Sequence, residues 1–238
     1  MTLQEIGQKA KEVSHVLGIL GTEEKNRGLR AVADALVSGQ DGILAANEKD
    51  MEKARENGMS QGLLDRLKLT PARIEGMAEG LRQVADLEDP VGEVISMKQR
   101  PNGLMIGQKR VPLGVIGMIY EARPNVTADA FGLCFKSGNA VILKGGSDAI
   151  YSNLAIVEQI RKGLSDAGLP EDAVLLIADT SRAVTRDFMK LNEYVDVLIP
   201  RGGAGLIKTV VENSTIPVIE KGTCLLYTSD AADDLTRV

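Results

Sequence analysis

The stretch that decides the fold reads VPLGVIGMIYEARPNVTADAFGLCFKSGNAVILKGGSD and spans residues 111–148. Its two continuous apolar runs, residues 114–120 and 140–144, predict buried strands, and the segment between them predicts a helix that ends at residues 137–139. Strands that are apolar along their whole length belong to parallel sheets covered on both faces. The stretch therefore predicts a parallel βαβ unit and an α/β fold.

Polar side chains and glycines follow each of these two strands. Ligands of open parallel sheets bind outside the carboxyl ends of the strands. The residues at these ends are Glu121, Arg123, Asn125, Lys144, Gly145, Gly146 and Ser147. Their density predicts a binding site at this edge of the sheet.

The rest of the chain extends the pattern in both directions. Before residue 90, helical spacing and capping signals predict helices over residues 4–17, 22–38, 42–57 and 60–67, and a longer one from residues 70–71. After residue 144, helices expected over residues 153–167, 180–189 and 205–212 alternate with strands expected over 174–178 and 195–199, and a last strand begins at 218–219. This order predicts a Rossmann-like open parallel sheet with helices on both faces and a set of N-terminal helices.

Residues 94–100 and 104–111 are candidate strands that Pro101, Asn102 and Gly103 connect. Asn-Gly between strand-like runs is a strong hairpin signal. The pattern alone is compatible with a solvent-exposed edge hairpin.

The composition excludes several classes of protein. The net charge of −5 over 238 residues lacks the basic excess of a nucleic-acid binder, and the longest apolar runs are too short to span a bilayer. A single histidine, His15, and two cysteines, Cys134 and Cys224, leave no set of metal ligands and no disulfide framework. The N-terminus has no signal-peptide pattern, so we expect a cytoplasmic protein.

Three further blocks carry a resemblance to a known family. They are LLDRLKLTPARIEGMAEGLRQVADLEDPVGEV (residues 63–94), RPNGLMIGQKRVPLGVIG (100–117) and VLIPRGGAGLIKTVVENSTIPVIEKGT (197–223). With residues 111–148, they closely resemble the gamma-glutamyl phosphate reductase family of the aldehyde dehydrogenase superfamily. The resemblance covers about residues 1–223.

The resemblance implies a domain organisation. Residues 1–223 are expected to form the N-terminal cofactor-binding domain of an aldehyde dehydrogenase-like fold, truncated before the catalytic domain. The hairpin at about residues 94–111 is expected to protrude and to serve oligomerisation. Residues 224–238, CLLYTSDAADDLTRV, depart from the family pattern and are expected to be a non-native tail.

The function that the resemblance implies is the NADPH-dependent reduction of L-glutamyl 5-phosphate to L-glutamate 5-semialdehyde and phosphate, in proline biosynthesis. A thiolate attacks the acyl phosphate, phosphate leaves, and hydride reduces the thioester. The nucleophilic cysteine would lie in the part that is missing. A homo-oligomer of the full-length enzyme and a functional link to glutamate 5-kinase are also implied. The alternative is a nucleotide-binding fragment without catalysis.

The resemblance also implies cofactor-binding residues. Lys144 corresponds to a lysine that holds the adenosine ribose of the cofactor or the phosphate on it, although a strand-end lysine can also simply extend to solvent. Gly145, Gly146 and Ser147 permit close approach of the backbone to a ligand, or form only a turn. Arg201, Gly202 and Gly203 stand between a strand and a helix, where free backbone N–H groups can bind phosphate.

Two candidate catalytic residues complete the expected site. Asn125 matches an asparagine that stabilises an oxyanion in the superfamily, or it is a helix N-cap. Glu220 aligns with a glutamate that can act as general base, or it is a solvated residue at a strand end. Cys134 is expected to be a buried helix residue that packs as a small hydrophobe.

Overall fold

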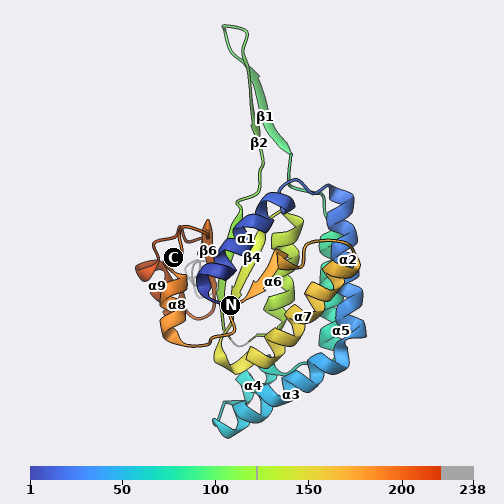
Figure 1. The fold of residues 1–238 in the computed structure, drawn as a ribbon, viewed down its shortest axis with the longest axis vertical. Coiled ribbons are helices and arrows are strands. Elements are labelled where there is room, and N and C mark those ends of the chain that lie inside the picture. Colours follow the sequence, from blue (N-terminus) through green and yellow to red (C-terminus); the bar gives the residue numbers. More distant parts are fainter. Residues whose placement is uncertain (122, 221–238) are drawn as a thin grey trace, which may run out of the picture.

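The computed structural model describes residues 1–121 and 123–220, and a parallel sheet lies at its centre (Figure 1). The strands are β3 (Val115–Tyr120), β4 (Ala140–Lys144), β5 (Val174–Leu176) and β6 (Val197–Arg201). Their order in the sheet is β5-β4-β3-β6, and all neighbours are parallel. Every residue of β3 and β4 is buried. The predicted Rossmann-like sheet is confirmed.

Helices connect the strands in the predicted alternation. They are α6 (Asn125–Lys136) after β3, α7 (Ile150–Asp166) after β4, α8 (Arg182–Phe188) after β5 and α9 (Ala204–Asn213) after β6. Short 3₁₀ turns, η1 (Ser147–Ala149) and η2 (Glu171–Ala173), precede α7 and β5. The connection from β3 to β4 and that from β4 to β5 therefore each contain a helix, as is usual between neighbouring parallel strands.

Two residues of β3, Gly117 and Tyr120, show that helices cover both faces of the sheet. The Tyr120 hydroxyl lies 2.7 Å from Thr127 Oγ1 on α6. Gly117 is three positions earlier, and a Cβ built on it would lie 2.8 Å from Phe188 on α8. Successive side chains of a strand point to opposite faces. The helices α6 and α8 therefore lie on opposite sides of β3.

Five helices precede the sheet, and they are α1 (Leu3–Leu17), α2 (Thr22–Ser38), α3 (Gln40–Glu56), α4 (Gln61–Leu67) and α5 (Pro71–Asp86). Helix α1 lies directly against β4, whereas α2 and α5 lie beside α6 and α7 (Figure 1). A continuous apolar core joins α1, α2, α3 and α5 to the sheet and includes the fully buried Leu29, Leu36, Ile74, Phe131 and Ile142. Leu67 of α4 packs instead with Met51 and Ala54 of α3 in a smaller cluster. Four of the five N-terminal helices thus share one core with the sheet.

The hairpin of β1 (Val94–Gln99) and β2 (Met105–Lys109) protrudes far from the body (Figure 1). Gly103 takes φ +85° in the turn, a left-handed conformation that glycine adopts without strain. Large apolar side chains along the hairpin are exposed, among them Ile95, Met97 and Met105. The predicted hairpin is confirmed, and its exposed apolar surface is more than a solvated edge needs.

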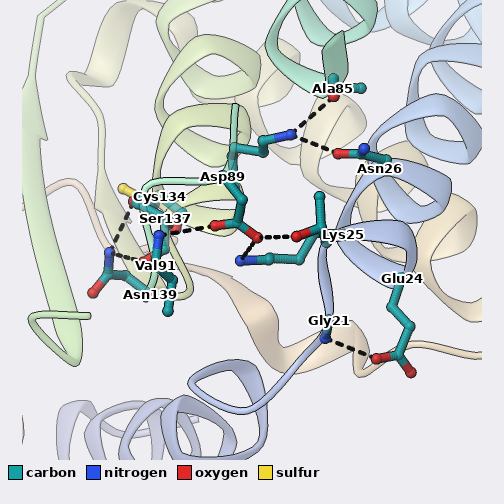
Figure 2. Close-up of polar contacts among 12 residues, drawn as sticks. Gly21, Glu24, Lys25, Asn26, Ala85, Asp89, Val91, Cys134, Ser137 and Asn139 are labelled. Atoms are coloured by element: carbon teal, nitrogen blue, oxygen red, sulfur yellow. Dashed lines mark hydrogen bonds and ion pairs between the residues drawn. The ribbon is translucent and has the colours of Figure 1, made fainter. Parts of the chain in front are cut away.

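Buried polar side chains bind the two segments from which the hairpin emerges (Figure 2). We call Lys25, Asp89 and Asn139 the hairpin-root cluster. Lys25, 1% exposed, forms an ion pair with Asp89, and Asp89 Oδ1 accepts from the backbone N–H of Val91 at 3.0 Å. On the other root, Asn139 Oδ1 accepts from the backbone N–H groups of Leu113 and Gly114 at 2.7 and 2.9 Å. The segment before β1 and the segment after β2 are therefore both held to the rest of the domain by hydrogen bonds.

Several elements differ from the sequence-based expectation: β5 ends at Leu176 instead of residue 178, and β6 spans Val197–Arg201 instead of residues 195–199. The helix expected from residue 153 begins at Ile150, because Asp50 of α3 accepts from the backbone N–H groups of Tyr151 and Ser152 at 3.2 and 2.7 Å and caps the helix from outside. The strand expected at residues 218–219 is a single parallel bridge between Val218 and Leu198. The residues expected to form the non-native tail, 224–238, lie outside the described residues.

Candidate functional site

The carboxyl ends of the four parallel strands meet at one edge of the sheet. Since β6 pairs directly with β3, the segments after Tyr120 and Arg201 are neighbours there. The segment after Lys144 lies on the other side of β3 at the same edge. Topology thus brings together most of the residues that the sequence singled out.

Lys144 is a buried cation with few partners. Its residue is 4% exposed, and its Nζ donates to the adjacent carbonyl of Gly145 at 3.1 Å. Burial lowers the pKa of Lys144, and the nearby carboxylate of Asp179 raises it in part. An ammonium group has three hydrogens to donate. Within residues 1–121 and 123–220 the carbonyl of Gly145 is the acceptor found for Lys144, which leaves capacity for an anionic ligand, in contrast to a lysine that extends to solvent.

Gly145 is buried, and its lack of a side chain is required by the packing. A Cβ on it would lie 2.4 Å from Nδ2 of Asn153, which is fully buried on α7. Asn153 Oδ1 accepts from Thr127 Oγ1 at 3.0 Å, while its Nδ2 has no hydrogen-bond partner among the described residues. The turn after β4 thus packs closely against the side-chain amide of Asn153, whose Nδ2 can still donate a hydrogen bond.

Gly146 and Ser147 continue this turn. Gly146 is the N-cap residue of η1, and Ser147 is exposed with its hydroxyl 3.3 Å from Asp148 Oδ1. These two residues leave the backbone accessible at the edge of the sheet.

The start of α9 already binds one anionic group of the protein. Glu121 Oε2 accepts from the backbone N–H of Gly203 at 3.1 Å, and Glu121 N–H donates to the carbonyl of Arg201 at 3.3 Å. A Cβ on Gly202 would lie 2.7 Å from Glu121 Cδ, so a side chain there would displace Glu121. The N-terminus of a helix favours an anion. The start of α9 therefore already has a carboxylate, that of Glu121, as the acceptor of one backbone N–H. Phosphate binding by Arg201, Gly202 and Gly203 stays a prediction.

Asn125 opens α6 and is exposed. The N-cap residue of the helix is Pro124, so the interpretation of Asn125 as an N-cap is wrong: it lies one position further, inside the first turn. Its Nδ2 donates to Asp129 Oδ2 at 3.4 Å. Burial raises the pKa of Asp129, and the positive charge of Arg201 acts against this. Asn125 and Asp129 thus form a polar pair beside the end of β3.

Glu220 is exposed and lies just beyond the bridge between Val218 and Leu198. Because this bridge is parallel, residues after it run toward the same edge of the sheet as Arg201. No contact between Glu220 and Asn125 is found within residues 1–121 and 123–220.

Cys134 lies inside α6, 4% exposed, and burial raises its pKa to about 12. It is the buried small hydrophobe that the sequence predicted, and not a nucleophile. Among the described residues no group of three His, Cys, Asp or Glu side chains could hold a metal ion. In the same part of the chain, no helix has the length and apolar character to cross a membrane.

The sequence reasoning gave no role to Asn153, Asp129 or Asp179. Asn153 stands in a helix 26 positions from its partner Thr127. Only an apolar helix face with an isolated amide could have pointed to it. Glu121 was recognised at a strand end, but its partner at the start of α9 depends on the pairing of β6 with β3.

The sequence of this chain is similar to those of known enzymes. The aldehyde dehydrogenase family profile matches residues 2–220. A gamma-glutamyl phosphate reductase of Lachnospira eligens is 60% identical over 98% of this chain and 56% of its own length, and one of Clostridium perfringens is 58% identical over 95% and 55%.

Solved structures agree. The crystal structure of gamma-glutamyl phosphate reductase from Thermotoga maritima has a TM-score of 0.91 at 46% identity, covering 93% of this chain and 53% of that one. That from Saccharomyces cerevisiae has a TM-score of 0.84 at 33% identity, covering 94% and 57%. The chain spans about half the length of the curated relatives it matches.

Proposed function

Because this chain belongs to the aldehyde dehydrogenase family, we propose that it binds a nicotinamide dinucleotide at the carboxyl edge of its sheet, as the cofactor-binding part of a gamma-glutamyl phosphate reductase. In this proposal residues 1–223 form the cofactor-binding domain. The single observation that carries it is Lys144, a buried ammonium group at a strand end whose acceptor among the described residues is the carbonyl of the adjacent Gly145.

Two further features fit the chemistry of a dinucleotide. The turn of Gly145 and Gly146 leaves room for close approach, and the buried Nδ2 of Asn153 offers a donor behind it. The start of α9 presents backbone N–H groups, and that of Gly203 already donates to the carboxylate of Glu121. A pyrophosphate group and a ribose phosphate are ligands that such groups recognise.

Within the proposed site, Lys144 binds the 2′-phosphate of NADPH as a point charge, and Gly145, Gly146 and Ser147 allow the adenosine end to approach. Arg201, Gly202 and Gly203 orient the phosphates at the start of α9. The cofactor supplies hydride when bound. NADPH is proposed over NADH because a buried ammonium gains most from the extra phosphate charge.

The proposed reaction is the reduction of L-glutamyl 5-phosphate to L-glutamate 5-semialdehyde and phosphate, in proline biosynthesis in the cytoplasm. Asn125 would stabilise the oxyanion and Glu220 would act as an auxiliary base. Cys134 is excluded as nucleophile by its burial. The proposal includes a homo-oligomer assembled through the hairpin, whose apolar side chains are exposed, and a functional link to glutamate 5-kinase. Nucleotide binding without catalysis is the alternative for the 238-residue chain.

Calorimetric titration of the chain with NADPH and NADH tests the proposal. We expect NADPH to bind more tightly, and Lys144→Ala to weaken NADPH binding by roughly 1–3 kcal/mol, the range for losing a hydrogen bond to a charged group. NADH binding should change less. Lys98→Ala, on the exposed hairpin, is the control for loss of one positive charge. Equal affinity for both cofactors in the parent chain and in Lys144→Ala would remove Lys144 from the site.

A further inference from the structure

A cavity of about 580 Å³ lies beside the start of α6, and the proposed cofactor site does not use it. Its walls are the end of α4, the start of α5, and Arg123, Asn125 and Asp129. The last three follow β3 directly, at the carboxyl edge of the sheet. The cavity therefore adjoins the place where a bound cofactor would act.

The cavity wall carries more positive than negative charge. Its charged side chains are Asp65, Arg66, Lys68, Arg73, Arg123 and Asp129. Arg73 is already engaged: its Nη2 lies 3.1 Å from Asp65 Oδ1, and its Nη1 donates to the carbonyl of Lys68 at 2.6 Å. It holds the turn between α4 and α5.

The other three cations of the wall are Arg66, Lys68 and Arg123. No acidic partner within 4.0 Å is found for them in residues 1–121 and 123–220. Asp129 remains as the one carboxylate that Arg73 does not neutralise. The wall thus combines several available cations with a single available anion.

The spacing of Asn125 and Asp129 adds a second observation. They are one helical turn apart on α6, and their side chains face each other at 3.4 Å. In an extended L-glutamyl group, the acyl carbon and the α-amino nitrogen are separated by four single bonds of about 1.5 Å each, or roughly 5 Å end to end. This is the separation of neighbouring positions on one helix face, where Cβ atoms lie about 5–6 Å apart. An L-glutamyl group is therefore long enough to reach from an acyl oxygen at Asn125 to an amino group at Asp129.

We propose that this cavity binds the amino-acid end of an L-glutamyl substrate. Asp129 accepts hydrogen bonds from the α-ammonium group, and Arg123, Arg66 and Lys68 provide the positive charge that binds the α-carboxylate. The inference rests on the proposed function, because it assigns a place to the substrate of that reaction. It makes Asp129 the residue that distinguishes an α-amino acid from a simple dicarboxylate.

Binding of two probes to the 238-residue chain tests the inference without turnover. The probes are L-glutamate and glutarate, which lacks only the amino group, and binding is followed by calorimetry. In the parent chain L-glutamate should bind more tightly than glutarate. Asp129→Asn should weaken L-glutamate by about tenfold or more, and leave glutarate unchanged or slightly tighter because a repulsive charge is removed. Asp166→Asn, at the exposed end of α7, is the matched control.

The outcomes separate this inference from the proposed function. An equal loss of both probes in Asp129→Asn, or no saturable L-glutamate binding by a chain that binds NADPH, would overturn the assignment of the cavity and leave the cofactor site standing. L-glutamate binding by a chain that binds neither NADPH nor NADH would overturn the proposed function. Circular dichroism spectra and melting curves of each variant establish that it is folded.

Discussion

Lys136 and Lys144 are buried to nearly the same degree, 3% and 4% exposed, yet their surroundings differ. Lys136 ends α6, and its Nζ donates to Asn26 Oδ1 at 2.6 Å and to the carbonyl of Ala85 at 2.9 Å, two of the residues in Figure 2. Lys144 ends β4, and its Nζ reaches the carbonyl of the next residue, at 3.1 Å. Burial lowers the pKa of both lysines.

The difference separates a structural cation from a binding cation. Lys136 joins α2 and α5 to α6 beside the hairpin-root cluster, so its charge is compensated by groups of the fold. Lys144 bears the cost of burial with little compensation from the described residues. A buried charge without good partners is costly for stability, and such groups concentrate at functional sites.

The largest effect is expected in the hairpin-root cluster. Asp89→Ala should lower the free energy of unfolding by about 3–5 kcal/mol, because it leaves the ammonium of Lys25 buried without its partner. Urea unfolding measures this. Asp86→Ala is the matched control: its ion pair with Arg30 is exposed and should contribute about 0–1 kcal/mol. A loss at Asp89 no larger than at Asp86 would show that the cluster is not structural.

This effect should depend on pH. Burial alone would raise the pKa of Asp89, but hydrogen bonds from Lys25, Val91 and Thr22 hold it below the ordinary value of 3.8. A carboxyl whose folded pKa is depressed stabilises the fold above its unfolded pKa, and this stabilisation is lost as pH falls through the folded pKa. The difference between the parent and Asp89→Asn should therefore be largest near neutral pH and shrink below about pH 4.

The turn after β4 should tolerate no side chain. Gly145→Ala places a Cβ against Asn153 Nδ2 and should lower the free energy of unfolding by roughly 1–3 kcal/mol, the range for overpacking. Gly80→Ala, in α5 with no atom within 4 Å of the added Cβ, should instead raise stability by about 0.5–1 kcal/mol. Thermal and urea unfolding compare them. Equal stability of Gly145→Ala and the parent would mean that this turn is not tightly packed.

The two lysines should respond differently to methionine. Lys136→Met leaves Asn26 Oδ1 and the carbonyl of Ala85 without their donor and should cost about 1–3 kcal/mol of unfolding free energy. Lys144→Met should change stability by less than about 1 kcal/mol or increase it, because a poorly compensated charge is removed. Chemical unfolding of both variants measures the contrast. A larger loss at Lys144 than at Lys136 would invert the comparison.

The smallest effect concerns Cys134. In a Cys224→Ser background it is the single thiol of the chain, and we expect almost no reaction with a thiol reagent in the native state, because burial raises its pKa to about 12. Labelling in denaturant gives the reference rate. Rapid labelling of the native protein at neutral pH would contradict this, because it would show that α6 opens and exposes Cys134 to solvent.

Much of the fold could be predicted from local sequence. The helix over residues 22–38 and the strand over residues 140–144 have the bounds that capping signals and apolar runs indicate. The start of α7 could not be predicted, because its capping group, Asp50, comes from another helix. Local rules describe one element at a time and contain no information on such partners.

The site was predictable to a lesser extent for the same reason. Lys144 and the glycines were found because they follow apolar strands at the edge where ligands bind. The partnership of Glu121 with Gly203 depends on strand order, and that of Asn153 with Gly145 depends on how α7 packs on the sheet. Glu220 and Asn125 remain predictions, since no described contact joins them.

The pKa of the Lys144 ammonium, with and without NADPH, tests the central claim most directly. It can be followed by NMR of the lysine ε-carbon, with Lys136 as the internal reference. We predict that the pKa of Lys144 lies below the ordinary value of 10.5 in the free chain and rises on NADPH binding, because a nearby anion favours the charged form, while that of Lys136 stays constant. An unchanged pKa of Lys144 in the NADPH-saturated chain would contradict the account.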